Sequence, residues 1–305
     1  MEEKDASRVA STAPPAGRGL RHFKPKAVVA ILAGSAVLLL AAGPARAQVL
    51  DANCPGPPNG AGVVPDPGDR DVQTFTAQRT GSLVRGETEI SKSGGAADWV
   101  MQIVTTDGSG TPTDNVLAST TIANASVPDG DSRIVGLFAS PASVVAGQQL
   151  GLLITRPGET YTLRDRDDNP CPGQEFFSAS GGPFMPEQPV FDFVFAVFVK
   201  PSNTVTLGQV TRNQKKGTAT LTVNVPNPGE LTGSGNGVNA SSAGPAVISK
   251  SVGAGQARLL IKAKGKKRKQ LNQKGKVKLN VAITYTPNGG DPSTQSVKVK
   301  LKKKL

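Results

Sequence analysis

Histidine is almost absent from this sequence: the 305 residues contain one, His22. A chain with no histidine after that point has no Ser-His-Asp or Cys-His catalytic group and no histidine-ligated metal site. Its two cysteines are too few for a zinc ribbon or a small disulfide-rich domain. Aromatic residues make up only 4% and charged residues 19%, whereas glycine numbers 35 and proline 24. This composition predicts short strands joined by tight turns, with little helix.

The first 47 residues have the features of an export leader. Residues 1–26 are rich in lysine and arginine, and an apolar stretch follows at residues 27–42. This stretch is shorter than the roughly 20 residues that span a bilayer. Gly43 and Pro44 then precede Ala45-Arg46-Ala47, an A-x-A cleavage pattern. We therefore predict a signal peptide at residues 1–47 and a secreted chain, held at the cell wall or free, with no transmembrane segment after cleavage. The alternative is an uncleaved membrane anchor.

Cys54 and Cys171 each begin a Cys-Pro-Gly sequence. Proteins outside the cytosol keep disulfides, so one bridge between the two is expected, with two free thiols as the alternative. The bridge would connect the Pro-rich start of the exported chain to a loop that precedes the last strand of the first half. Chain-entropy models give a loop of this length a stabilisation of about 4–5 kcal/mol.

Charge divides the exported chain into two halves. Residues 48–199 carry 18 acidic and eight basic side chains, whereas residues 200–305 carry two acidic and 20 basic ones. All but one of the aromatic residues after the leader also lie in the first half. Such a change of composition predicts a domain boundary. We expect a Pro/Gly-rich leading segment at residues 48–70, an acidic domain at 71–199 and a basic domain at 200–305.

Both halves show strand patterns. In the acidic half, about nine short apolar runs lie between turns, and the last, residues 190–199, is apolar on both faces, as in a strand buried on both sides. In the basic half, residues 276–285 and 297–302 alternate strictly between apolar and polar, and six or seven strands are expected. We therefore predict an all-β fold, with a jelly-roll-like antiparallel sandwich followed by an immunoglobulin-like sandwich.

Several segments match patterns known from bacterial surface proteins. In the acidic half they are residues 71–77, 81–83, 97–103, 110–118, 144–153 and 191–195, and in the basic half residues 212–221, 262–267, 275–278 and 284–287. The first set resembles the jelly-roll modules known as choice-of-anchor or carbohydrate-binding-like domains, except at residues 164–172, where an acidic insert carries a cysteine. The second set resembles a lysine-rich module of exported actinobacterial proteins. The resemblance implies a β-sandwich at the cell surface.

The densest charge lies at residues 262–269, which we interpret as a loop. Such density attracts polyanions and releases their counterions. The expected partner is an anionic wall polymer, an acidic polysaccharide or a lipid head group. The alternatives are solvated lysines that protect edge strands, or a basic half that docks on the acidic half. Nucleic acid is not expected, because one aromatic residue offers no stacking platform, and no oligomeric state is indicated. The six side chains are Lys262, Lys264, Lys266, Lys267, Arg268 and Lys269.

Asp165, Asp167 and Asp168, followed by Asn169, offer the oxygen ligands that calcium takes. The D-x-D-G loop pattern is absent, however, and Arg164 and Arg166 partly neutralise the group. The alternative to a calcium site is a polar loop. A second acidic group, formed by Asp66, Asp69 and Asp71, leaves the same two interpretations open.

Catalysis is not expected, since the sequence offers only one carboxylate pairing for glycoside hydrolysis, Glu175 with the Asp165–Asp168 region. Trp99 lies among apolar neighbours and is predicted to be core, whereas Tyr161 lies between threonines and is predicted to be at the surface. The favoured hypothesis is an exported, non-enzymatic binding, adhesion or structural protein whose basic half associates with wall polyanions. The competing hypothesis is a carbohydrate-binding module or a carbohydrate-active hydrolase.

Overall fold

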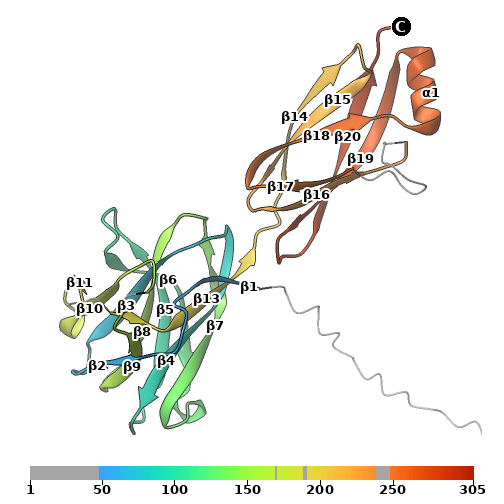
Figure 1. Ribbon diagram of the computed structural model, residues 1–305. Coiled ribbons are helices and arrows are strands. Elements are labelled where there is room, and N and C mark those ends of the chain that lie inside the picture. Colours follow the sequence, from blue (N-terminus) through green and yellow to red (C-terminus); the bar gives the residue numbers. More distant parts are fainter. Residues whose placement is uncertain (1–47, 169, 188–190, 238–247) are drawn as a thin grey trace, which may run out of the picture. The chain divides into compact units, whose positions relative to one another are not determined.

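The computed structural model describes residues 48–168, 170–187, 191–237 and 248–305, and every structural statement below concerns these residues (Figure 1). The predicted signal peptide, residues 1–47, lies outside them. The fold is all-β, as predicted, with a single ten-residue α-helix among the described residues. The strands form four antiparallel sheets that make two sandwiches, and each sandwich is described by itself. Among the described residues, no helix has the length and apolarity needed to cross a membrane.

The first sandwich consists of two sheets, which we call A and B. Sheet A runs β1-β13-β4-β9-β12, with β2 paired to β9 and β7 to β4; sheet B runs β11-β10-β3-β8-β5-β6. Two 3-10 helices, Asn124–Ser126 and Ala179–Gly181, lie in its connections. The strands of sheet A are β1 (Val49–Asn53), β2 (Gly60–Val64), β4 (Gly81–Lys92), β7 (Gly130–Val144), β9 (Tyr161–Arg166), β12 (Asp192–Phe193) and β13 (Phe195–Pro201). Those of sheet B are β3 (Arg70–Thr76), β5 (Trp99–Thr106), β6 (Pro112–Ile122), β8 (Gln149–Thr155), β10 (Glu175–Ser178) and β11 (Met185–Pro186).

The leading segment, residues 48–70, belongs to the sandwich. Its strand β1 pairs with β13, and its strand β2 pairs with β9. The acidic half therefore contains thirteen strands in the described residues, where the sequence predicted about nine. The sequence pattern did not reveal these two strands, because each is only five residues long and lies next to proline and glycine residues that are typical of turns.

The aromatic core of the first sandwich corrects one prediction and confirms another. Trp99 is fully buried, as predicted. The prediction for Tyr161 was wrong: its ring is buried and lies edge-on to that of Trp99, with the centroids 5.7 Å apart, and its hydroxyl donates to the Ile154 carbonyl at 2.8 Å. Thr162 points to the opposite face of β9 because side chains alternate along a strand, and Thr160 precedes the strand, so neither carries information about the tyrosine's own face.

The strand predicted at residues 190–199 is divided in two. β12 ends at Phe193 and β13 begins at Phe195, while residue 190 lies outside the described part of the chain. Phe193, Phe195 and Val197 lie in the core, as the predicted face requires.

Cys54 and Cys171 form the predicted disulfide, with their Cα atoms 5.2 Å apart and both residues buried. Cys54 follows β1, and its amide donates to the Phe195 carbonyl at 3.0 Å. Cys171 lies in the connection between β9 and β10, where its amide donates to the carboxylate of Asp192 at 3.0 Å. The bridge thus joins the first strand of the sandwich to a connection 117 residues later in the chain.

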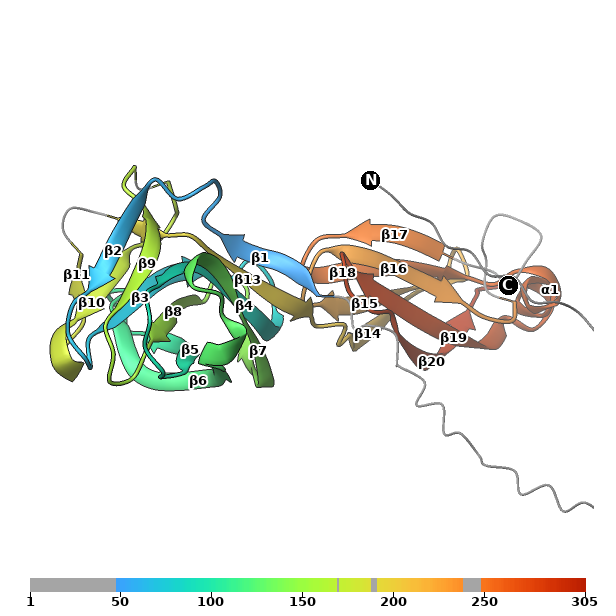
Figure 2. The same cartoon turned by 90° about the horizontal axis from the view of Figure 1, so that it is seen from below.

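The second sandwich has seven strands in the described residues, within the predicted number. They divide into sheets of three and four, the division found in immunoglobulin-like sandwiches. Figure 2 shows these strands with α1 (Gly265–Lys274) at one end of the sandwich. Sheet C contains β14 (Thr206–Asn213), β15 (Thr218–Val225) and β18 (Gly255–Lys262), and sheet D runs β17 (Ile248–Val252), β16 (Gly229–Ser234), β19 (Lys276–Pro287) and β20 (Ser293–Lys302).

Candidate functional site

The lysine-rich segment at residues 262–269 is mostly helical, which corrects the prediction of a loop. Lys262 ends β18, Lys264 is the N-cap residue of α1, and the helix continues to Lys274. Lysine, arginine, glutamine and leucine all favour helix. Leu271 anchors the helix in the core, and Gly275 ends it in the left-handed conformation that glycine adopts most easily. Gly275, six residues after the lysine-rich segment, was the available sequence clue to a helix end.

Cations dominate the beginning of α1. Lys266, Lys267, Arg268 and Lys269 all lie in its first half, and its first turn contains no acidic residue. A helix N-terminus carries a partial positive charge and is normally stabilised by acidic side chains. In α1 the side-chain charges add to the positive end of the helix, so an external anion at this place would be stabilised by both.

A hollow of about 480 Å³ lies beside α1. Its walls come from the β14–β15 turn, the end of β18, α1 and the end of the chain after β20. Two of its cations, Lys216 and Lys303, were not in the predicted set, because they lie far from residues 262–269 in the sequence. The Lys303 ammonium donates to the Asn272 side chain at 2.8 Å. The basic residues that line the hollow are Lys216, Lys262, Lys264, Arg268 and Lys303.

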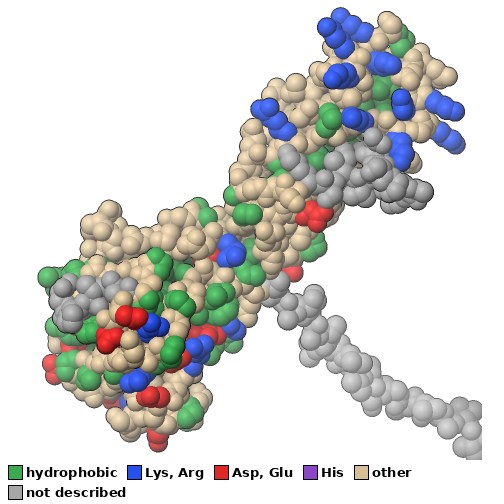
Figure 3. All heavy atoms as spheres, viewed as in Figure 1, with side chains coloured by type: hydrophobic (Ala, Val, Ile, Leu, Met, Phe, Trp, Pro, Cys, Tyr) green, Lys and Arg blue, Asp and Glu red, His purple; other side chains and the backbone are tan. Residues whose placement is uncertain are grey.

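Strands β19 and β20 carry a second group of cations, which we call the lysine ladder. Lys276 lies directly opposite Lys302, and Lys278 lies directly opposite Lys300. All four side chains are exposed, as is that of Lys298 two residues along β20. Like charges directly opposite one another on antiparallel strands are destabilising. Figure 3 shows lysine and arginine side chains gathered over the part of the second sandwich around α1.

The two sandwiches differ in how their basic side chains are balanced. Each of the eight basic side chains in residues 48–199 forms an ion pair within that sandwich, so these cations are used internally. In residues 202–305, which follow β13, the sequence offers only Glu230 and Asp291 as acidic side chains for 19 basic ones. The same internal balance is therefore not available to the second sandwich. The eight paired residues are Arg70, Arg79, Arg85, Lys92, Arg133, Arg156, Arg164 and Arg166.

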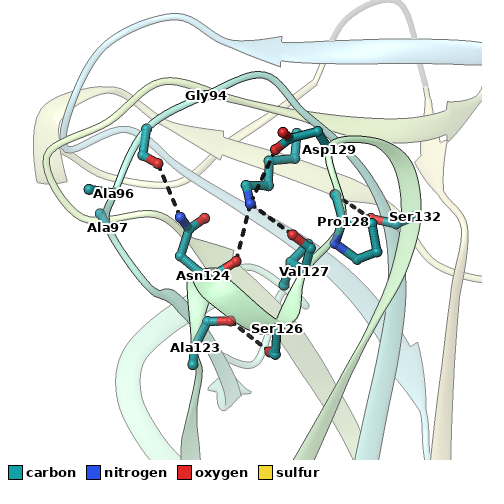
Figure 4. Close-up of polar contacts among 12 residues, drawn as sticks. Gly94, Ala96, Ala97, Ala123, Asn124, Ser126, Val127, Pro128, Asp129 and Ser132 are labelled. Atoms are coloured by element: carbon teal, nitrogen blue, oxygen red, sulfur yellow. Dashed lines mark hydrogen bonds and ion pairs between the residues drawn. The ribbon is translucent and has the colours of Figure 1, made fainter.

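Lys92 illustrates this internal use (Figure 4). Its ammonium donates to the carbonyl oxygens of Asn124 at 3.1 Å and Val127 at 2.8 Å, at the end of the first 3-10 helix, and pairs with Asp129 at 3.2 Å. The Asn124 side chain in turn donates to the Gly95 carbonyl at 3.0 Å. Lys92 thus holds residues 124–129 against the end of β4, and the Asn124 side chain joins them to the loop that follows that strand.

Arg156 has a similar role, and its replacement gives a first prediction. It is buried, lies over the Trp99 ring, donates to the Gly94 carbonyl at 2.8 Å and pairs with Glu159 at 2.8 Å. Arg156→Met is expected to lower the free energy of unfolding by about 2–4 kcal/mol, because these acceptors lose their donor. Chemical denaturation measures this loss. Arg133→Met, at a half-exposed side chain, is the control and should cost less than about 1 kcal/mol.

The structure separates the residues predicted to hold calcium. Asp165 lies at the inward face of β9 and is buried, whereas Asp167 and Asp168 lie in the exposed turn that follows. The Asp168 carboxylate accepts hydrogen bonds from the Arg166 guanidinium at 2.8 and 2.6 Å. Asn169 lies outside the described residues. The three aspartates thus do not face a common point, because β9 ends between the first and the other two.

The second predicted acidic group is also divided. The Asp69 carboxylate accepts hydrogen bonds from the amides of Asp66 at 3.2 Å and Ser180 at 2.7 Å, so it holds a turn together. Asp71 lies on β3 and is buried.

The carboxylate pairing predicted for hydrolysis is brought together inside the sandwich. Glu175 on β10 and Asp165 on β9 are 4% and 2% exposed, which places them between the sheets and not on a sugar-binding surface. Burial, and then the charge of Asp165, raise the pKa of Glu175 to about 10. Burial raises the pKa of Asp165 to about 7.

These features define an all-β protein of two sandwiches, the second of which carries a dense and internally unbalanced positive charge. No protein-family model matches the chain, and no curated protein matches it. Among solved structures, it is similar to a DUF4785 family protein from Legionella pneumophila, at 8% identity over 83% of this chain and 93% of that one. The TM-score of 0.22 does not show a shared fold.

Proposed function

We propose that this chain is an exported, non-enzymatic binding protein that associates with polyanions of the cell wall through its second sandwich. The binding surface comprises the cations of α1, the hollow beside it and the lysine ladder, which together we call the basic surface. The observation that carries the proposal is the ladder, where lysines face lysines across two strands in a sandwich with two acidic side chains. This arrangement lowers stability unless an external anion offsets it.

Protection of an edge strand explains only part of this charge. β20 is the edge of sheet D, and lysines on an edge strand discourage pairing with other chains. β19 is an inner strand, however, paired with β16 on one side and β20 on the other. Lys276 and Lys278 on β19, and the five cations of α1, therefore need another explanation, and anion binding supplies it.

The chemistry of the basic surface favours a polymer over a small ligand. Cations two residues apart on a strand are separated by roughly 6.6 Å, and those on opposite strands by about 5 Å, so they present a regular array. The lysine ammonium is a strongly hydrated point charge on a flexible stem, so it recognises the charge of a ligand more than its shape. A chain with repeated phosphate or carboxylate groups, such as an anionic wall polymer or an acidic polysaccharide, matches this array.

The proposal is tested by neutralising the ladder. A variant of the whole chain with glutamine at Lys276, Lys278, Lys300 and Lys302 is expected to bind poly(glycerol phosphate) at least tenfold more weakly than the parent, measured by calorimetry at low salt. Its melting temperature should be unchanged or higher, because the like-charge pairs are removed. The control carries arginine at the same positions and should retain binding. Unchanged affinity in the glutamine variant would contradict the role of the ladder.

A further inference from the structure

Three acidic side chains converge inside the first sandwich. Asp71 on β3 and Glu175 on β10 come from sheet B, and Asp165 on β9 comes from sheet A. By strand alternation, Asp71 shares a face with Phe75, Glu175 with Phe177, and Asp165 with Leu163, all of which contact the main core. The three carboxyls therefore point into the space between the two sheets, and their exposed fractions are 5%, 4% and 2%. We call them the buried acidic cluster.

The cluster has no cation of its own among the described residues. None of its three members forms an ion pair there. Arg164, whose charge lowers the pKa of Asp165, pairs instead with Asp131 at 3.5 Å. Burial and mutual repulsion raise the pKa of Asp71 to about 8. Buried carboxylates are normally paired with a basic side chain or coordinate a metal ion.

Two oxygen atoms of the cluster have no hydrogen-bond partner. They are Oδ1 of Asp165 and Oε2 of Glu175, and both are buried. Two neighbouring aspartates show the contrast. Both Asp192 oxygens accept hydrogen bonds, from Gln73 at 2.7 Å and from the Cys171 amide at 3.0 Å, and both Asp69 oxygens accept hydrogen bonds from backbone amides.

Protonation alone does not explain these two atoms. A neutral carboxyl group still carries a donor and an acceptor, and buried polar groups of this kind almost always pair. The Asp165 and Glu175 oxygens lie close enough for their charges to interact, yet no hydrogen bond joins them. Oxygen atoms without donors, among several buried carboxyl groups, are suited to a cation.

We propose that Asp71, Asp165 and Glu175 bind a hard divalent cation, calcium in the first place, between sheets A and B. Calcium accepts six to eight oxygen ligands in flexible geometry and includes water among them, whereas magnesium requires a near-ideal octahedron. Glycine at position 62 of β2 lets the Asp165 carboxylate pack directly against that strand, since a Cβ there would come within 2.5 Å of Oδ2 of Asp165. The site differs from the turn formed by Asp167 and Asp168, of which it uses neither residue.

Binding requires the carboxylates to move closer together. The one set of three donor atoms within 4.8 Å of one another in the described residues is Cys54, Cys171 and Asp192, and its sulfurs are joined in the disulfide. The donor atoms of the cluster therefore lie further apart than in a closed coordination sphere. Rotation of side chains, with water filling the remaining positions, is how the ion would be enclosed.

The test is a titration of the whole chain with calcium chloride at pH 7.5, after dialysis against EDTA. Binding heat is expected, together with a rise in melting temperature of roughly 5–10 °C at a hundredfold excess over Kd. Glu175→Gln and Asp165→Asn should each abolish the heat. In EDTA both variants should melt at or above the parent temperature, because a buried carboxyl group without a cationic partner is replaced by a neutral amide, so loss of binding is distinguished from loss of folding. The matched control, Asp167→Asn with Asp168→Asn, should bind calcium as the parent does.

Three outcomes would overturn the proposal. The first is a parent chain that gives neither binding heat nor a shift in melting temperature. The second is full binding heat in the Glu175→Gln and Asp165→Asn variants. The third is loss of binding heat in the control variant, which would place the ion in the exposed turn.

Discussion

Replacing both Cys54 and Cys171 by serine is expected to lower the free energy of unfolding by about 3–5 kcal/mol, or the melting temperature by roughly 6–20 °C. The bridge closes a separation of 117 residues, and long loops lose the most chain entropy on crosslinking. It also fixes the Cys171 amide against Asp192, which in turn holds Gln73 across the two sheets. Denaturant unfolding of parent and variant measures the difference.

Reduction of the parent chain provides the control for this prediction. If the bridge itself is responsible, the reduced parent and an alanine double variant should unfold at similar denaturant concentrations. The oxidised parent should unfold at a clearly higher one. A serine variant as stable as the oxidised parent would show that the bridge adds nothing to the sandwich.

The stability of the metal-free chain is expected to fall by at least about 3 kcal/mol between pH 5 and pH 9. The pKa values of Asp165, Asp71 and Glu175 are raised to about 7, 8 and 10 in the folded chain. In the unfolded chain these carboxyls return to their ordinary values near 4. The folded state therefore binds more protons than the unfolded state, and its free energy of unfolding falls as pH rises through the raised values.

Charged groups from several strands and loops act on the buried acidic cluster. Burial is the largest influence on each of the three pKa values, and the remaining ones are neighbouring carboxylates, the Arg164 guanidinium and a hydrogen bond from the Gly62 amide to Asp165. Glu175→Gln is expected to remove a large part of the decline, as measured by melting in EDTA across the pH range. Asp114→Asn, at an exposed side chain, is the control and should leave it unchanged. Constant stability from pH 5 to 9 would contradict the raised pKa values. The acidic side chains concerned are Asp69, Asp71, Asp165, Glu175, Glu187 and Asp192.

Local pattern was enough to predict much of the second sandwich. The alternation of Val277, Leu279 and Val281 with polar residues places these three in the core, and β19 and β20 follow it closely. The compartment suggested by the leader was enough to predict the disulfide. The strand alternation is visible within a few consecutive residues, and the disulfide follows from the presence of two cysteines.

Features that depend on distant segments were missed. The buried acidic cluster joins residues 71, 165 and 175 from three strands, and no local pattern shows that they meet. Asp71 lies an even number of residues from the core residue Phe75 on its strand, and Asp165 from Leu163 on its own. This alternation was the only indication in the sequence that the two carboxyls point inward. Lys216 and Lys303 of the hollow were missed for the same reason. The helix α1 was missed because its lysines suggested solvent, although its residue types favour helix.

Association of the whole chain with poly(glycerol phosphate), followed across a series of sodium chloride concentrations, tests the proposed binding most sharply. We expect affinity to fall at least tenfold between 50 and 200 mM salt, because several lysines release counterions when they bind, and we expect no binding to a neutral glucan. Affinity that does not change with salt, or retention on the neutral glucan alone, would show that the basic surface is not where this protein binds.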